Sequence, residues 1–195
     1  MTIVETDPTS QRAPWAKQRI LDTASDLFYR EGIRQVGVDR LISLSSVTKA
    51  TFYKHYRAKE NLVVAYAKNL HEQEVQKVDK LVKESANAQA ALDSLVEETI
   101  RRFESPTFRG DAFVNAAIEY PDLSHPIRLV IATHRDWYSK IVEELLAKIG
   151  HALPGEGADD FVVLRDGAMV AAYAGDPVAA AGAFRRGYQR ILATR

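Results

Sequence analysis

The sequence contains no cysteine among its 195 residues. This absence excludes a disulfide framework, a zinc site built on thiolates, a catalytic cysteine and a cysteine-based redox sensor. No segment has the roughly 20 apolar residues that a membrane-spanning helix requires. The first residues also lack the basic start and apolar run of a signal peptide. We therefore expect a cytoplasmic protein that has no membrane partner.

Catalytic motifs are missing as well. The sequence has no glycine-rich loop that would hold a phosphate, no pair of histidines four residues apart and no serine nucleophile elbow. Glu119, His125 and His134 follow no known spacing of metal ligands. We predict that the protein is not an enzyme, has no catalytic residues and binds neither a cofactor nor a metal.

The formal net charge is zero, but the charge is unevenly distributed along the chain. Residues 12–59 hold ten lysine or arginine residues against four acidic ones, a net charge of +6, whereas the rest of the chain is acidic. A small basic segment attached to an acidic body is typical of a domain that contacts a polyanion such as DNA.

Apolar residues at helical spacing predict an all-α fold with about nine helices and no strand. In the first helix, Ile20, Ala24, Leu27 and Phe28 form one buried face, and Gly32 ends the helix. Near the C-terminus, Asp176 is placed to cap a helix that has Pro177 at its first position. The expected helices cover about residues 15–31, 38–44, 48–56, 59–84, 89–104, 108–120, 127–149, 158–174 and 177–193.

The first three of these helices predict a helix-turn-helix unit over residues 15–58, preceded by a flexible arm at residues 1–14. In such a unit the second helix of the motif enters the major groove of DNA. Phe52 and Tyr56 anchor one face of this helix, and Thr48 can cap it. Its other side chains supply hydrogen-bond donors and methyl groups for base edges and phosphates. Lys59, at the start of the next helix, is placed to contact a phosphate.

This region resembles the tetracycline-repressor family of transcriptional regulators. The resemblance rests on Val47-Thr48-Lys49-Ala50-Thr51-Phe52-Tyr53-Lys54-His55-Tyr56, followed by Lys59-Glu60-Asn61-Leu62, and it covers about residues 15–65. It implies that DNA is contacted by Thr48, Lys49, Ala50, Thr51, Tyr53, Lys54, His55 and Lys59. Two positions depart from the family pattern. Val36-Gly37 stands where the family has a hydroxyl pair, and Ser45-Ser46 stands where it has a small residue followed by glycine.

The resemblance also implies that residues 59–195 form an effector-binding and dimerisation domain. The partners would be a palindromic double-stranded DNA operator, a second copy of the chain bound through helices at about 158–174 and 177–193, and a small-molecule effector that releases the repressor. Small residues at 168–174 and 179–181 allow close helix packing at such an interface.

Residues of the effector site are harder to identify from the sequence. His134 lies on the apolar face of its helix, where a core role is the simpler interpretation. Asp111, Asn115 and Glu119 recur every four residues, which is typical of a solvated stripe and alternatively of a polar pocket wall. As candidate ligand-binding residues we take Phe113, Asn115, Glu119, His134, Trp137, Tyr138 and Tyr173.

Two alternative functions stay open at this point. One is an all-helical small-molecule-binding protein or enzyme that has no role on DNA. The other is a ligand-binding or scaffold module that has lost DNA binding, which is suggested only by the atypical residues Val36-Gly37 and Ser45-Ser46.

Overall fold

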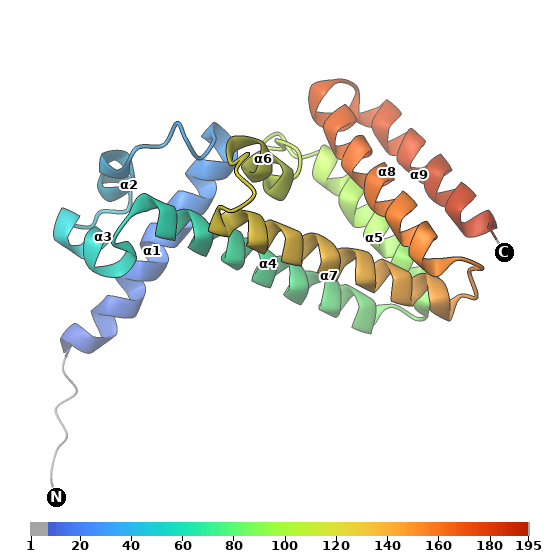
Figure 1. Ribbon diagram of the computed structural model, residues 1–195, viewed down its shortest axis with the longest axis horizontal. Helices are drawn as coiled ribbons and strands as arrows, with labels where there is room; N and C mark the ends of the chain where they lie inside the picture. Colours follow the sequence, from blue (N-terminus) through green and yellow to red (C-terminus); the bar gives the residue numbers. More distant parts are fainter. Residues whose placement is uncertain (1–7, 195) are drawn as a thin grey trace, which may run out of the picture. The chain divides into compact units, whose positions relative to one another are not determined.

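The structure, a computed structural model, describes residues 8–194, with side chains from residue 15 onward. This part of the chain folds into helices only, which confirms the predicted all-α class (Figure 1). The helices are α1 (Pro8–Glu31), α2 (Val38–Leu44), α3 (Lys49–Tyr56), α4 (Lys59–Glu84), α5 (Ala88–Phe103), α6 (Ala112–Glu119), α7 (Pro126–Lys148), α8 (Pro154–Ala174) and α9 (Pro177–Ala193).

Two helices begin earlier than the sequence predicts. α1 starts at Pro8, so residues 8–14 are helical rather than part of an irregular arm, and the remainder of the predicted arm lies outside the described residues. α8 starts at Pro154, inside the predicted loop. Both starts carry a proline, whose fixed φ suits the first turn of a helix and whose missing N–H has no partner there in any case.

Packing divides the chain into two compact units, the first ending at Asn69 and the second beginning at Leu70, both within α4. The sequence places the domain boundary at residue 59, where α4 begins. The first unit therefore also takes in the first turns of α4. In the described residues no helix is both long and apolar enough to cross a membrane.

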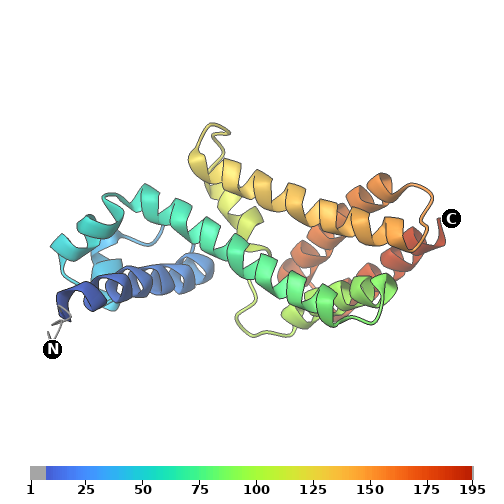
Figure 2. The ribbon, with the colours of Figure 1, turned by 90° about the horizontal axis from the view of Figure 1, so that it is seen from below.

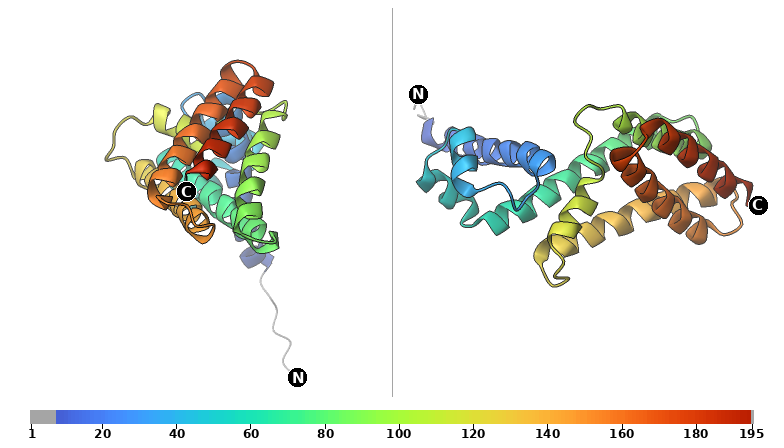
Figure 3. Two further views of the ribbon diagram at one scale, coloured as in Figure 1. Left: turned by 90° about the vertical axis from the view of Figure 1, so that its right-hand side faces the viewer. Right: turned by 90° about the horizontal axis from the view of Figure 1, so that it is seen from above.

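The first unit packs α1, α2 and α3 together with the start of α4 (Figure 3). The predicted face of α1 is buried, since Ile20, Ala24, Leu27 and Phe28 are at most 6% exposed. Gly32 ends α1 with a φ of 95°, a left-handed conformation that glycine adopts without steric penalty.

The second unit is built from α5 to α9 and the later part of α4 (Figures 1 and 2). α8 and α9 pack closely along their length, and α5 and α7 pack against α8. A Cβ atom on Gly187 of α9 would lie 2.5 Å from Leu164 Cδ2 on α8, so a larger residue at this close approach would displace the Leu164 side chain. As predicted, Asp176 caps α9 by accepting hydrogen bonds from Val178 N and Ala179 N, with Pro177 at the first position.

Candidate DNA interface and effector site

Helix α3 buries two anchoring side chains on one face and exposes most of its other side chains to solvent. Phe52 and Tyr56 are 0% and 3% exposed, which confirms the two predicted anchors. Thr48 caps the helix as expected, because its hydroxyl accepts a hydrogen bond from Thr51 N at 3.1 Å. Facing solvent are Thr48, Lys49, Ala50, Tyr53 and Lys54, while Thr51 and His55 are half-buried. The predicted contacts of these residues with DNA stay predictions.

Lys49 has a weak partner in the free protein. Its Nζ lies 3.8 Å from Asp39 Oδ1, and both side chains are largely exposed, at 70% and 92%. An exposed pair of this kind contributes little to stability and is screened by salt. The amine of Lys49 is therefore available to exchange Asp39 for a phosphate or a base edge.

Lys59 has a structural contact that the sequence did not indicate. Its Nζ donates a hydrogen bond to the Ile33 carbonyl oxygen at 2.6 Å and lies 5.8 Å from the centre of the Phe28 ring. This contact ties the start of α4 to the segment that follows α1. An ammonium group has three N–H donors, and the hydrogen bond to Ile33 uses one of them. Two donors are left for the predicted phosphate contact, which stays a prediction.

An aromatic cluster lies in the second unit, formed by His71, Phe113, His134, Trp137 and Tyr138. The rings of Phe113 and His134 are stacked, with centroids 3.7 Å apart and planes 11° from parallel. His71 Nδ1 lies 3.3 Å from His134 Nδ1, and the Trp137 ring lies 5.5 Å from both imidazoles. The cluster therefore joins α4, α6 and α7.

A buried ion pair borders this aromatic cluster. Arg165 Nη2 lies 3.1 Å from Asp111 Oδ2, and the two side chains are only 8% and 9% exposed. The Arg165 guanidinium also lies 4.8 Å from the centre of the Tyr138 ring. Asp111 caps α6 by accepting hydrogen bonds from Phe113 N and Val114 N. The interpretation of residues 111, 115 and 119 as a solvated stripe is therefore wrong for Asp111.

Burial and charge set the protonation of these groups. Burial raises the pKa of the Asp111 carboxyl, but the Arg165 guanidinium and the two backbone N–H donors outweigh burial and hold the pKa below its usual range. Burial lowers the pKa of His134 from 6.5 to about 4, with Asp111 opposing the change and Arg165 reinforcing it. At neutral pH the structure thus holds an ionised Asp111 beside an uncharged His134.

The structure brings together four of the seven candidate effector residues, namely Phe113, His134, Trp137 and Tyr138. The others lie elsewhere. Asn115 Nδ2 donates to the Arg109 carbonyl, Glu119 ends α6, and Tyr173 is 51% exposed on α8, with its ring 5.6 Å from the Arg109 guanidinium. Their predicted role in binding an effector remains untested.

Sequence reasoning missed His71 and Arg165, and it considered Asp111 only as part of a solvated stripe or, alternatively, of a polar pocket wall. A signal was present for Arg165, because it shares one face of α8 with the buried residues Phe161, Ala168 and Ala172, where a charge needs a partner. His71 likewise lies between buried Ala67 and Val78 on α4.

His125, weighed above as a metal ligand, instead caps α7, since its Nδ1 accepts a hydrogen bond from Ile127 N. Within residues 15–194, no three histidine or acidic side chains are grouped to hold a metal ion.

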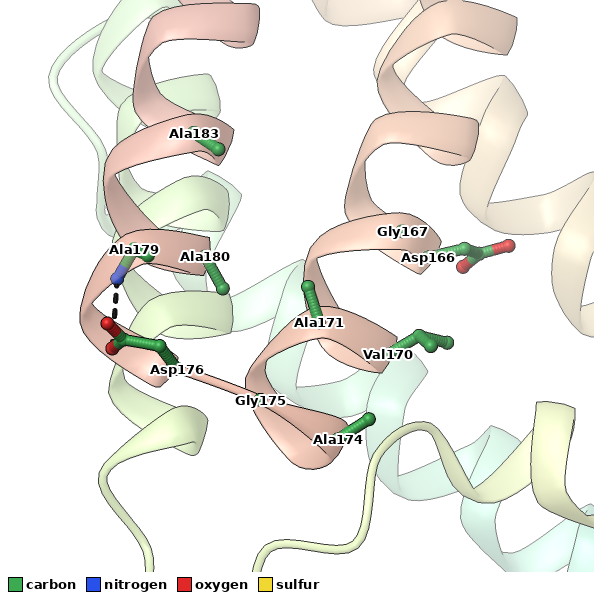
Figure 4. A pocket seen from close by; sticks show the side chains of 10 residues that line it. All are labelled: Asp166, Gly167, Val170, Ala171, Ala174, Gly175, Asp176, Ala179, Ala180 and Ala183. Atoms are coloured by element: carbon green, nitrogen blue, oxygen red, sulfur yellow. Dashed lines mark hydrogen bonds between the residues drawn. The ribbon is translucent and has the colours of Figure 1, made fainter.

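The helices α8 and α9 leave an apolar surface exposed. Val163, Val170 and Tyr173 of α8 and Val178 of α9 are 51–80% exposed. Beside Val170 a hollow of about 760 Å³ opens between the two helices (Figure 4). Apart from Val170, its lining consists of small and acidic residues, Asp166, Gly167, Ala171, Ala174, Gly175, Asp176, Ala179, Ala180 and Ala183.

Comparisons with known proteins agree with this architecture. The family model for bacterial regulatory proteins of the tetR family matches residues 20–66. A TetR-family transcriptional regulator from Streptomyces coelicolor is 36% identical, and the match covers 91% of this chain and 94% of that chain with a TM-score of 0.87. A search of curated proteins found no match.

Two more distant structures share the fold. A putative TetR transcriptional regulator from Streptomyces avermitilis is 22% identical, with 91% of this chain and 96% of that chain covered and a TM-score of 0.81. A putative transcriptional regulator from Saccharomonospora viridis, solved in complex with choline, is 19% identical, with 92% and 96% covered and a TM-score of 0.77.

Proposed function

This chain belongs to the TetR family of bacterial regulatory proteins, and from that premise we propose that it is a repressor that a small-molecule effector releases from a palindromic operator. The family consists of DNA-binding transcriptional regulators rather than enzymes. The observation that carries the proposal is the surface of α3, where Lys49, Tyr53 and Lys54 project outward from a helix held by buried Phe52 and Tyr56. We place this activity in the cytoplasm, where the chromosome lies.

Dimerisation through α8 and α9 is the second part of the proposal. Exposed Val163, Val170 and Tyr173 lie on one helix, and large exposed apolar side chains grouped in this way are typical of an interaction surface. The small residues around the hollow let a second pair of helices approach closely. A two-fold dimer would present two copies of α3 to two half-sites of a palindrome.

The effector is proposed to bind at the aromatic cluster. Its rings offer flat apolar contacts, and Asp111 and Arg165 beside it offer charge that is shielded from water. The choline bound by the Saccharomonospora viridis protein supports the idea that a fold of this type can hold a small molecule.

The proposal is tested by selecting duplexes from a random-sequence pool with the purified full-length protein. We expect an enriched palindromic sequence whose affinity falls as salt concentration rises, because bound lysines release counterions from the phosphates. Lys49→Ala and Tyr53→Ala should abolish specific binding while sedimentation still shows a dimer. A protein that enriches no sequence, or a wild-type monomer at micromolar concentration, contradicts the proposal.

A further inference from the structure

The turn that precedes α3 contains a residue in a strained backbone conformation. Ser46 has a φ of 51°, in the left-handed region that side chains disfavour and glycine adopts freely. α2 ends at Leu44, directly before this turn, and its N-cap at the far end, Gly37, makes no side-chain capping hydrogen bond. Local hydrogen bonds tie the turn to α2, among them one from the Ser45 hydroxyl to the Leu41 carbonyl oxygen at 2.6 Å and one from Val47 N to the Ile42 carbonyl oxygen at 3.3 Å. They hold Ser46 in a conformation that is unfavourable for a serine.

A side chain from α1 reaches this turn. The Nη2 group of Arg19 donates a hydrogen bond to the carbonyl oxygen of Ser45, a residue that is 1% exposed. The Arg19 guanidinium is itself packed against Trp15, with its carbon 4.2 Å from the centre of the indole ring. Arg19 thus has a fixed orientation and satisfies a backbone acceptor that water does not reach.

The other end of α3 is fastened to the same stretch of α1. The Tyr56 hydroxyl donates a hydrogen bond to the Lys17 carbonyl oxygen at 3.0 Å. Burial and the nearby Asp22 carboxylate raise the pKa of Tyr56 to about 12, so the hydroxyl keeps its proton. Two hydrogen bonds, one to the turn before α3 and one from its last residue, therefore connect this region to residues 17–19 of α1.

We propose that Arg19 is a positioning residue for DNA reading, because it holds the Ser45-Ser46 turn in the conformation that orients α3. This inference rests on the proposed function. Arg19 acts through the turn and does not need to touch DNA. When only a fraction of molecules has the binding conformation, the apparent affinity falls by that fraction. In the wild-type protein Arg19 keeps this fraction near one.

The test begins with Arg19→Met, measured on the duplex that the wild-type protein selects from a random-sequence pool. We expect affinity to fall about tenfold, which corresponds to 1.4 kcal/mol. The matched control is Arg30→Met, which removes the same charge from α1 at an exposed pair with Asp26. This control should change affinity less than twofold. Equal losses in the two variants would mean that Arg19 contributes only its charge, and would overturn the inference.

Ser46→Gly separates positioning from a general loss of structure. In the Arg19→Met background it should recover about fivefold in affinity, because glycine restores the left-handed turn without the arginine. In the wild-type background it should change affinity less than twofold, since the turn is already in place. An equal gain in both backgrounds would show that the two residues are not coupled, and would overturn the inference.

Hydrogen exchange provides a readout that does not depend on DNA. In Arg19→Met the amides of residues 45–56 should exchange at least tenfold faster, while those of α9 stay unchanged. A uniform increase over both units would indicate global destabilisation and contradict the inference. If the wild-type protein selects no duplex, the proposed function fails, and the exchange of residues 45–56 alone decides whether Arg19 holds the turn.

Discussion

The two units of this protein differ in whether they bury charged side chains. In the first unit, Lys49 and Lys54 project from α3 into solvent, and within residues 15–69 no charged side chain is buried. In the second unit, Arg165 is 6% exposed and paired with Asp111, and His134 is 5% exposed. The first unit thus leaves its charged side chains exposed, whereas the second also encloses an ion pair.

This difference predicts how each unit responds to substitution. An exposed charge adds little to the free energy of unfolding but is free to contact a polyanion. A buried ion pair stabilises the fold only while both partners are present, because removal of one leaves an uncompensated charge in a low-dielectric interior. Substitution of the exposed charges on α3 should therefore affect DNA affinity, and substitution of the buried pair in the second unit should affect stability.

The largest effect is expected for Arg165→Met. The variant leaves the Asp111 carboxylate without its partner and should lower the free energy of unfolding by about 3–5 kcal/mol. Arg185→Met is the matched control, since Arg185 forms a pair with Glu97 in which both side chains are about half exposed, at 49% and 50%. Its effect should stay below about 1 kcal/mol. Urea unfolding of the full chain measures the loss of stability in both variants. Equal losses would contradict the prediction that the buried pair contributes more to stability than the exposed pair.

The next effect is a dependence of stability on pH that comes from His134. Its pKa is about 4 in the folded chain, against an ordinary value of 6.5. The unfolded chain therefore binds the proton first as the pH falls. Stability is fully present above pH 6.5 and decreases by up to about 3 kcal/mol as the pH falls to 4.

His134→Phe isolates this contribution. The charged and titratable groups that act on His134 are Asp111, Arg165, His71 and Glu74, and all four remain in the variant. The difference in unfolding free energy between wild type and variant should be constant above pH 6.5 and should change between pH 6.5 and 4. A difference that stays constant over the whole range would show that His134 does not titrate as the structure indicates.

The same contrast explains how far the sequence could predict the molecule. The faces of α1 and α3 follow from local periodicity, so the burial of Phe28, Phe52 and Tyr56 was predictable. The pair of Asp111 with Arg165 joins residues 54 positions apart, and no local pattern specifies which helices bring them together. The contacts of Arg19 with Ser45 and of Lys59 with Ile33 were likewise missed, because each depends on how α1 packs against later segments.

Smaller effects on the free energy of unfolding are expected in the first unit, where Ser46 has an unfavourable backbone conformation. Ser46→Gly should raise the free energy of unfolding by about 1 kcal/mol, because it removes the penalty of a left-handed serine. Ser46→Ala is the control, since alanine keeps that penalty and should give no gain. Thermal unfolding compares the two variants. A gain in the alanine variant equal to that in the glycine variant would trace the effect to loss of the hydroxyl instead.

The smallest effect concerns the start of α2. Gly37 has the extended backbone of a capping residue, and a Cβ atom added there meets no atom within 4 Å. Gly37→Ser should therefore be accommodated, supply the missing cap and raise the free energy of unfolding by about 0.5 kcal/mol. Gly37→Ala fills the same space without an acceptor and should lower stability, since alanine is a poor cap. If alanine stabilises as much as serine, the gain comes from reduced freedom of the unfolded chain, and the absence of a cap does not limit the stability of this unit.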